Sequence, residues 1–353
     1  MNFYEIDFIE AGDIDSGDAI ALRYGDGVNI ETVHIVDGGH ADDGQKLINH
    51  IKNYYDKKEF IDHVVLTHSD QDHACGLKSV AQDSNIGTLW MNRPWVHVDN
   101  LLPMFEYSYT REGLIERLKN DYPHVAELEN IAKEKSIPIK DVFQGTVIGN
   151  FIVLAPTLNR YLSLIVNSEK TPEPTTTANN IFQKVKQAIR YIVSIWGAEN
   201  LKGDTEGTTD ENEMSIVQYA QFGEEKIVLT GDAGVEALEE AHQYATKIGI
   251  ILPGVTRFQV PHHGSRRNLS SEILDKWLGP KLANKPEKHL FSAMISASKN
   301  DPDHPRKAVL RALSHRGAGV VTTKGVTKYW FNNTLRPGWG YSELEEYPED
   351  MEE

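Results

Sequence analysis

Histidine and aspartate recur at four places in this sequence where an apolar run typical of a β-strand stops. In chain order these residues are Asp37; His68, Asp70, Asp72 and His73; Asp232; and His262, His263 and the later His304. Imidazole and carboxylate groups are the ligands that Zn, Mn and Fe take in proteins, with water completing the shell. Because side chains at strand ends converge at one edge of an α/β layer, the sequence predicts a metal centre there.

The spacing inside the segment from His68 to His73 suggests how two ions would be shared. If the extended chain continues, His68 and Asp70 point the same way and bind one ion. Asp72 and His73 then turn towards a second ion as a helix begins. Asp232 would bridge the pair, an arrangement that activates water and clamps the attacking and leaving oxygens. Taken singly, each residue also fits a turn or a cap, and a calcium loop is disfavoured by the two histidines.

The elements that must position these residues alternate between strand and helix patterns. Strands are expected at 3–9, 19–24, 31–36, 61–67, 146–154, 214–222, 226–230, 256–260 and 290–298, and edge strands up to 331. Helices are expected at 43–55, 111–119, 125–135, 178–196, 235–248, 270–278 and 306–315. This order favours a layered α/β domain over 1–340, interrupted by irregular insertions at 91–145 and 155–212. The acidic tail, 341–353, is expected to be frayed or solvated.

The amino-acid composition argues against several classes of function. The 353 residues include 36 Lys and Arg against 52 Asp and Glu, a formal charge of −16, which argues against a protein that coats nucleic acid. The single cysteine, Cys75, excludes an intrachain disulfide and a cysteine-rich zinc site, and is expected to be a small buried residue. The N-terminus lacks a signal-peptide pattern and no apolar run is long enough to span a membrane, so the expected location is cytoplasmic.

The chemical segments resemble the metallo-β-lactamase superfamily. The resemblance is carried by Asp37-Gly38-Gly39, the segment His68-Ser69-Asp70-Gln71-Asp72-His73, Thr230-Gly231-Asp232 and the final histidines. Within the superfamily, the chain is most similar to the hydrolase domain of bacterial competence DNA-uptake channel proteins and their stand-alone relatives. That closer match is carried by Ile9-Glu10-Ala11-Gly12 with Ser16-Gly17-Asp18-Ala19-Ile20, Asp at position 70, His262-His263-Gly264-Ser265 and Asp303-His304-Pro305. The resemblance covers about 1–90 and 212–330 and implies a four-layer αββα sandwich.

The resemblance also implies a role for each residue of the centre. His68 and Asp70 would bind one divalent ion, Asp72 and His73 the other, and Asp232 would bridge them. His263 or His262 would complete the shell, and His304 would be a further ligand or meet the leaving group. Asp37 would orient a histidine or the bridging water. The sequence departs from the superfamily in one place, because no histidine occurs at 210–215, where Asn212 or Glu213 would have to replace it.

Several residues near the centre are candidates for binding the substrate. Ser265, Arg266, Lys299 and Asn300 could hold an anionic oxygen, although a helix cap and solvated side chains fit the same residues equally well. The first insertion is rich in aromatic residues and arginines, namely Arg93, Trp95, Phe105, Tyr107, Tyr109 and Arg111. Such residues stack single-stranded bases, or they form the small core of a cap or a contact with a protein partner or a second copy.

These features predict a hydrolase that uses a metal-activated water. Two divalent ions, Zn or Mn, are the expected cofactors, with Asp72 or Asp37 holding the water and His304 giving a proton to the leaving oxygen. The closer resemblance implies a phosphodiesterase or nuclease acting on DNA or RNA. One alternative is hydrolysis of a small molecule such as a lactone, phosphonate, nucleotide or other small phosphoester. The other is a metal-stabilised module that binds a partner.

Overall fold

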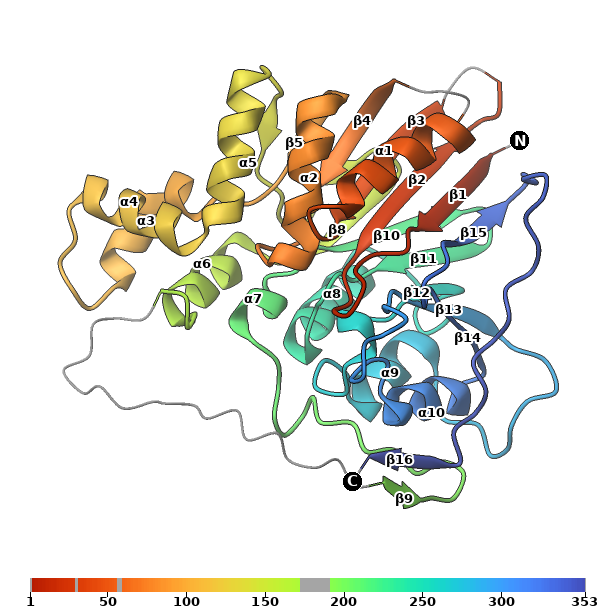
Figure 1. Cartoon of the computed structure of the whole chain (residues 1–353). Helices are drawn as coiled ribbons and strands as arrows, with labels where there is room; N and C mark the ends of the chain where they lie inside the picture. Colours follow the sequence, from red (N-terminus) through yellow and green to blue (C-terminus); the bar gives the residue numbers. More distant parts are fainter. Residues whose placement is uncertain (1, 29–30, 56–58, 172–190, 353) are drawn as a thin grey trace.

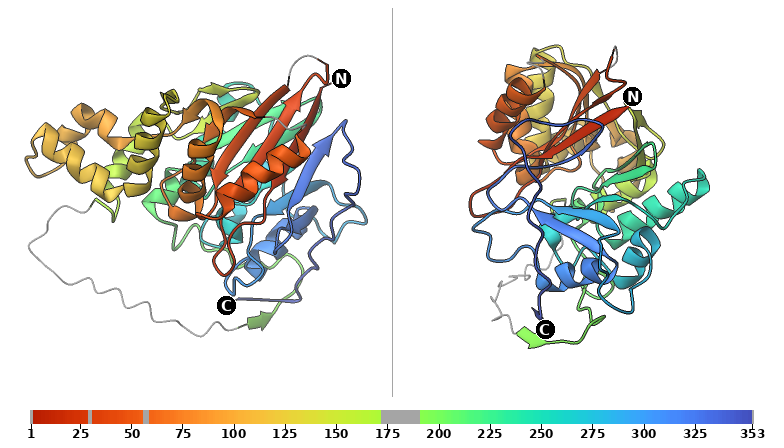
Figure 2. Two further views of the ribbon diagram at one scale, coloured as in Figure 1. Left: turned by 45° about the horizontal axis from the view of Figure 1, so that its top comes forward. Right: turned by 90° about the vertical axis from the view of Figure 1, so that its right-hand side faces the viewer.

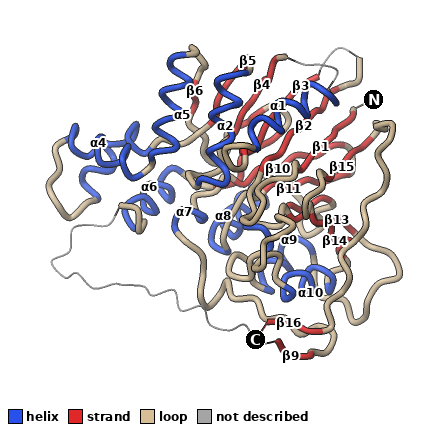
Figure 3. The backbone as a smooth tube through the Cα atoms, viewed as in Figure 1, coloured by secondary structure: helices blue, strands red, loops and turns tan. Residues whose placement is uncertain are grey.

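The computed structural model describes residues 2–28, 31–55, 59–171 and 191–352. In this part of the chain two seven-stranded sheets face each other and helices cover their outer faces (Figure 1). The four-layer αββα sandwich expected from the sequence is therefore confirmed. Figure 3 shows the helices outside the strands.

The first sheet comes from the N-terminal part of the chain plus one C-terminal strand. Its order is β15 (Lys328–Asn332), β1 (Phe3–Phe8), β2 (Ala19–Gly25), β3 (Glu31–Gly38), β4 (Phe60–Val65), β5 (Asn85–Trp90) and β6 (Ile139–Lys140). Strands β15, β1, β2 and β3 are antiparallel, and β3 to β6 run parallel. The parallel half brings the carboxyl ends of β3 and β4 to the same edge.

The second sheet repeats this plan with the later strands. Its order is β14 (Ala318–Thr322), β13 (Phe291–Ile295), β12 (Arg257–Gln259), β11 (Glu225–Leu229), β10 (Val217–Phe222), β8 (Phe151–Ala155) and β7 (Val147–Ile148). Strands β11 to β14 are parallel, whereas β11, β10, β8 and β7 are antiparallel. The carboxyl ends of β11, β12 and β13 therefore also share one edge.

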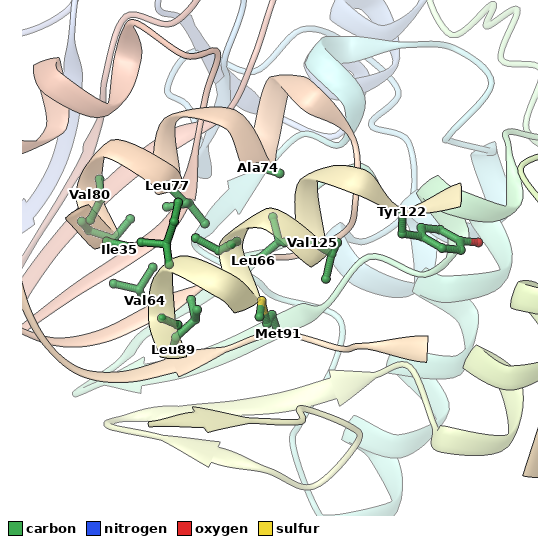
Figure 4. Packing of buried hydrophobic residues seen from close by; sticks show 14 of the residues in the cluster. Ile35, Val64, Leu66, Ala74, Leu77, Val80, Leu89, Met91, Tyr122 and Val125 are labelled. Atoms are coloured by element: carbon green, nitrogen blue, oxygen red, sulfur yellow. The ribbon is translucent and has the colours of Figure 1, made fainter. Parts of the chain in front are cut away.

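Three buried apolar clusters fill the three spaces between the four layers. The middle cluster joins the two sheets through residues such as Phe8, Ile20 and Leu229. The outer cluster on the first sheet includes α1 (Asp43–Tyr54), α2 (Gln71–Asp83) and α5 (Pro123–Glu134), and Figure 4 shows part of it. The other outer cluster includes α8 (Val235–Lys247), α9 (Ser271–Leu278) and α10 (Lys307–His315). Each of these helices presents apolar residues at intervals of three or four, which is why one face is buried.

The first insertion contains α3 (Val98–Leu101), α4 (Arg111–Asp121) and α5, which confirms the two helices predicted there. In Figure 1 and in the left view of Figure 2 this segment extends beyond the sheets. Trp95 and Phe105 are buried in the same cluster as α2, so they belong to a core and are not free to stack on bases. Arg93 is bound to Glu129 and Asp141, and Arg111 to Asp99. A protein partner or second copy on this segment stays a prediction.

The second insertion differs from the expectation. A helix that was not expected, α6 (Leu158–Asn167), starts at Thr157, whose side chain accepts a hydrogen bond from the Arg160 amide. A short helix, α7 (Asp210–Glu213), ends the insertion. Most of the helix predicted at 178–196 lies outside the described residues. Its last part is wrong, because β9 (Tyr191–Val193) is a strand that pairs with the C-terminal β16 (Asp350–Glu352).

The C-terminal tail is not frayed at its end, which corrects the sequence-based expectation. Strand β16 lies beside α10, and the Glu352 side chain is buried (Figure 1). The Glu352 carboxylate accepts hydrogen bonds from the amides of Lys307 and Ala308, at 2.8 and 2.9 Å. These are the first amides of α10, which has no capping side chain of its own. The tail therefore supplies the cap from 44 residues away.

Replacing Glu352 by alanine is expected to lower the free energy of unfolding by about 1–2 kcal/mol, because two helix amides lose a charged acceptor. Urea denaturation followed by circular dichroism measures this. Glu343→Ala, a change at an exposed carboxylate in the same tail, is the control and should leave stability unchanged. Equal unfolding midpoints for the wild type and Glu352→Ala would contradict the capping role.

Within the described residues, no helix has the length and apolar character needed to cross a membrane.

Candidate metal centre

The histidine and aspartate residues singled out in the sequence follow strands from both sheets. Asp37 is the second-last residue of β3, and the segment from His68 to His73 covers the end of the loop after β4 and the first turn of α2. Asp232 follows β11, His263 follows β12, and His304 lies in the loop after β13. These five strands are the parallel parts of the two sheets, so their carboxyl ends meet at one edge of the sandwich.

Four side chains from these strand ends form a cluster with the geometry of a metal site. Asp72, His73, Asp232 and His263 each offer one ligand atom, and these atoms all lie within 4.8 Å of one another. The Nε2 atom of His73 is 3.3 Å from Asp232 Oδ1 and 3.6 Å from Asp72 Oδ2. The Nε2 atom of His263 is 3.3 Å from the same Asp72 oxygen. Two imidazoles and two carboxylates are a donor set suited to Zn or Mn.

Close backbone packing places His73 of this cluster beside Asp37. Helix α2 lies directly on the end of β3, where a Cβ atom at Gly76 would be 1.9 Å from the Gly38 carbonyl oxygen. No other residue type fits that contact. It places His73, on the first turn of α2, against Asp37 in β3. The glycines at 38 and 76 therefore serve to bring a ligand and its supporting carboxylate together.

Asp37 orients the ring of His73. The His73 Nδ1 atom donates a hydrogen bond of 2.7 Å to Asp37 Oδ2, which leaves Nε2 facing the cluster. Asp37 is itself held by the amide and hydroxyl of Thr67, at 2.8 and 2.6 Å. It also has a positive φ of 58°, an uncommon conformation that this network maintains.

His263 is oriented by the backbone. Its Nδ1 atom donates a hydrogen bond of 3.0 Å to the Ser296 carbonyl oxygen, so Nε2 again faces the cluster. His262 and His263 have positive φ values of 48° and 55° in succession. Two consecutive residues with strained backbone after a strand are typical of functional sites. The conformational free energy of such strain is usually retained only where it places particular side chains.

The charges of the cluster favour a bound cation. Burial opposes the charge on His73, but Asp232, Asp37 and Asp72 raise the pKa of His73 well above its ordinary value. Burial alone would raise the pKa of Asp72, yet His73 and His263 lower it to about 2. In the same way, Asp232 and Asp72 overcome burial and raise the pKa of His263 to about 9. Without an ion, protons on the imidazoles offset the carboxylates.

The donor atoms themselves fit a metal. Buried atoms without a hydrogen-bond partner include His73 Nε2, Asp232 Oδ1, His68 Nε2 and Asp18 Oδ1. Buried polar atoms are nearly always bonded, and a bound ion accounts for several unbonded ones in one place. The residues present therefore fit a divalent ion held by Asp72, His73, Asp232 and His263.

Asp18 belongs to this region and was missed as a site residue. It is buried, and together with Asp37 and His73 it forms a second group of ligand atoms within 4.8 Å. The Gln259 side chain donates a 3.0 Å hydrogen bond to Asp18 Oδ2. Burial is the main reason that the pKa of Asp18 is raised, with Asp232 adding to the effect. An aspartate directly before an apolar strand was the available signal, but the same pattern is typical of turns.

His68 and Asp70 lie beside the cluster without joining it. Among the described residues neither one belongs to a group of three close ligand atoms. His68 Nε2 is 3.7 Å from Asp70 Oδ2, and the other Asp70 oxygen is 2.5 Å from Lys170 Nζ. Burial would raise the pKa of Asp70, but hydrogen bonds from His68 and Lys170 lower it well below its ordinary value.

Asn212 and Glu213 are the two residues expected to replace the missing mid-chain histidine. Glu213 points away from the centre, because its carboxylate binds Arg160 and the Ala237 amide at 2.7 Å each, so this alternative is wrong. Asn212 is buried beside the centre, but its amide nitrogen contacts Thr208 Oγ1 at 2.7 Å and His262 Nδ1 at 2.9 Å.

His262 and His304 form the border of the cluster. The Nε2 atom of His262 is 3.8 Å from Asp232 Oδ2, outside the four-residue group that includes His263. The His304 ring lies parallel to that of His262, with centroids 5.8 Å apart. Asp301 accepts a 3.1 Å hydrogen bond from His304 Nδ1 and is held by the Ser16 hydroxyl at 2.7 Å. His304 is therefore oriented next to the centre by a carboxylate that was not predicted.

The predicted substrate-binding residues lie on loops that carry site histidines. Ser265 and Arg266 follow His263, and the Ser265 hydroxyl accepts a hydrogen bond from the Arg267 amide. Lys299 and Asn300 are exposed after β13, in the loop that leads to His304. Their contact with a substrate stays a prediction. Cys75 is only partly buried, and its sulfur lies 3.7 Å from His124 Nδ1, away from the ligand group.

Replacing Asp37 by asparagine is expected to weaken metal binding by about 10–100-fold, because His73 loses the anionic partner that orients it. Asparagine tolerates the positive φ at this position, so the fold should be retained. Isothermal titration of the metal-free protein with Zn²⁺ measures the affinity, with Asp83→Asn at the exposed end of α2 as the control. An unchanged affinity in Asp37→Asn would show that the carboxylate has no part in holding the ion.

Comparison with known proteins supports the superfamily resemblance. A family model described as the metallo-β-lactamase superfamily matches residues 17–151, a region that includes Asp37 and the segment from His68 to His73. Asp232 and His263 lie beyond the match. Among curated proteins, none matches this chain. The closer resemblance to competence proteins stays a prediction.

Several solved structures are similar to this one at low identity. The hydrolase AbOPH of the β-lactamase superfamily is 14% identical, over 65% of this chain and 68% of its own, with a TM-score of 0.31. Zn²⁺-bound PqqB from Methylobacterium extorquens is 8% identical, over 92% of this chain and 99% of its own, with a TM-score of 0.43. The metallo-β-lactamase SMB-1 is 13% identical, over 69% and 76%, with a TM-score of 0.30.

Proposed function

We propose that this chain is a metal-dependent hydrolase whose ion is held by Asp72, His73, Asp232 and His263, and that its substrate is a phosphodiester of DNA or RNA. The observation that carries the proposal is the four-residue group itself. Its ligand atoms lie within 4.8 Å of one another, and two of them are buried without a hydrogen-bond partner. The superfamily match supports the same chemistry, since that superfamily consists largely of metal-dependent hydrolases.

The surrounding residues support hydrolysis more than a purely structural metal. A bound divalent ion would supply Lewis-acid chemistry, lowering the pKa of water and stabilising negative charge that develops on the substrate. Asp37 and the Ser296 carbonyl keep the two imidazoles with Nε2 towards the ion. Asp301 holds the proton of His304 at Nδ1. When the ring carries a second proton, that proton is on Nε2, which is the atom that would pass it to the leaving oxygen.

The choice of a phosphodiester rests on the closer resemblance and on the basic residues near the histidines. Arg266 and Lys299 lie on the loops that carry His263 and His304, in a chain whose net charge is −16, whereas the neighbouring Arg267 is paired with Glu206 at 3.1 Å. Cationic groups placed beside an acidic centre are what an anionic substrate oxygen requires. The overall acidity argues against an extended electrostatic surface for nucleic acid and is the main argument for the small-molecule alternative, so a nucleic-acid substrate would have to be held by local contacts.

The test compares the purified protein with a double variant, Asp72→Ala/His73→Ala. Labelled single- and double-stranded DNA and RNA are incubated with each protein in Mn²⁺ or Zn²⁺. Cleavage by the wild type alone, abolished by EDTA, is the expected result. Equal products from both proteins would show that the centre has no role in cleavage.

A panel of small substrates separates the alternatives. Turnover of a lactone, phosphonate or nucleotide without cleavage of nucleic acid would replace the phosphodiester assignment by small-molecule hydrolysis. An ion bound at the centre with no turnover of any substrate would instead favour a metal-stabilised module that binds a partner.

A further inference from the structure

A lysine occupies the half of the centre that the sequence assigned to a first metal ion. The Lys170 ammonium lies 2.5 Å from Asp70 Oδ1 and 3.3 Å from Ser69 Oγ. Asp70 is the residue expected to share an ion with His68, which lies 3.7 Å from the other Asp70 oxygen. The positively charged ammonium of Lys170 is therefore already paired with Asp70, one of the expected ligands.

The turn that carries Lys170 is anchored on both sides. Ser168 and Thr171 are buried, and the Thr171 amide donates to the Ser168 carbonyl at 3.0 Å. The Lys170 amide donates to the Ser168 hydroxyl at 3.0 Å, and the same hydroxyl hydrogen-bonds to Glu211. The ammonium also lies 5.8 Å from the centre of the Tyr122 ring, a cation–π distance. The Lys170 side chain is 36% exposed, but its backbone and its ammonium both have defined neighbours.

Among the described residues, the same half of the centre has no third ligand of its own besides His68 and Asp70. No histidine occurs at 210–215, where the resemblance implies one, and the amide nitrogen of Asn212 there is bonded to Thr208 and His262. Within the described part of the chain, His68 and Asp70 join no group of three ligand atoms, whereas Asp72, His73, Asp232 and His263 form a complete set. One half is therefore built for an ion, and the other holds one histidine, one carboxylate and an ammonium.

We propose that Lys170 takes the place of the first metal ion, so that the chain binds one divalent ion instead of two. The inference rests on the proposed metal centre and deepens it, since it fixes the number of ions and names the residue that determines it. A divalent ion and an ammonium repel each other strongly when both contact one carboxylate in a partly buried site. As long as Lys170 holds Asp70, a second ion would have only His68 and a shared carboxylate as ligands.

The test counts ions in the full-length protein without relying on activity. Metal-free wild type, Lys170→Ala and Lys170→Arg are titrated with Zn²⁺ and with Mn²⁺, and bound ions are counted by native mass spectrometry. Wild type and Lys170→Arg are expected to bind one ion. Lys170→Ala is expected to bind a second one at least about tenfold more tightly than the wild type does, because the repulsion is gone. Lys276→Ala, which removes a lysine paired with Glu239 and Glu272 on the far helices, is the control and should behave as the wild type.

Each contrary result has a distinct meaning. Two tightly bound ions in the wild type would overturn the role of Lys170 and leave the proposed hydrolase intact. One ion in both wild type and Lys170→Ala would also overturn it, because another feature would then limit the number. No bound ion in any of the proteins would overturn the proposed function itself, and this inference with it.

Discussion

The Asp232→Asn variant is expected to lose metal binding and hydrolysis together while it keeps its fold. Asp232 is buried, and its two oxygens lie 3.3 Å from His73 Nε2 and 3.8 Å from His262 Nε2. Asparagine has the same size and retains an oxygen, so packing is preserved. It lacks the negative charge that holds a divalent ion, and a neutral amide is a much poorer ligand for Zn²⁺ or Mn²⁺ than a carboxylate.

We expect the rate of hydrolysis to fall at least about 10³-fold. That is the largest loss usually seen when one stabilising hydrogen-bond donor is removed from an active site. It is measured as kcat/KM on whichever substrate the wild type cleaves, with ion content determined on the same sample. Asp83→Asn, an exposed change on α2, is the matched control and should retain both properties. Wild-type activity in a folded Asp232→Asn protein would remove Asp232 from the centre.

The Glu199→Gln variant is expected to lower the free energy of unfolding by about 3 kcal/mol, because it removes one partner from a buried charge network. Glu199 Oε1 accepts hydrogen bonds of 2.9 Å from His315 Nδ1 and 2.8 Å from Arg316 Nη1. The side chains of His315 and Arg316 are 0% exposed and that of Glu199 is 2% exposed. Asp275 remains next to Arg316 in the variant, which limits the loss.

The effect of Glu199→Gln should depend on pH. Burial would raise the pKa of Glu199, but hydrogen bonds from His315 and Arg316 lower it to about 2. A carboxylate whose pKa is lower in the folded than in the unfolded state stabilises the fold above the unfolded value, about 4.3 for glutamate. That stabilisation is lost as pH falls through about 2. The gap between wild type and variant is therefore constant above about pH 5 and shrinks below it.

Chemical denaturation at pH 7 and pH 3 measures both effects. Glu272→Gln, which changes a carboxylate whose side chain is 76% exposed and paired with Lys276, is the control and should cost less than about 1 kcal/mol. A Glu199→Gln protein as stable as the control would show that the network contributes nothing. A gap that widens at low pH would contradict the assignment of the pKa.

The layers of the fold could be predicted because the strands and most helices have regular apolar patterns. The apolar residues of α1 and α10 recur every three or four positions, and the strands are short apolar runs. Helix α6 had the same signal, with Leu158, Tyr161, Leu162 and Ile165 after the cap Thr157, but the irregular sequence around it obscured the pattern. The pairing of β9 with β16 left no local signal, because it depends on contacts between segments more than 150 residues apart.

Some residues of the candidate site could be predicted from the sequence, and others could not. The ligand types were visible because aspartate and histidine at the ends of apolar strands break the local pattern. Asp18 was missed because one aspartate before a strand looks like a turn residue. Asp301 and Lys170 were missed for another reason: their partners, His304 and Asp70, are reached through the folding of loops, in the second case across 100 residues. Spacing alone also left His262 and His263 equivalent, whereas backbone geometry places His263 in the group.

The most direct test of the metal centre is anomalous X-ray diffraction from crystals loaded with Zn²⁺ or Mn²⁺, recorded at the absorption edge of the metal. We expect one strong peak, bound by Nε2 of His73, Nε2 of His263 and the carboxylates of Asp72 and Asp232. No peak at these four residues, or a peak bound only by other side chains, would contradict the centre on which the proposed function rests.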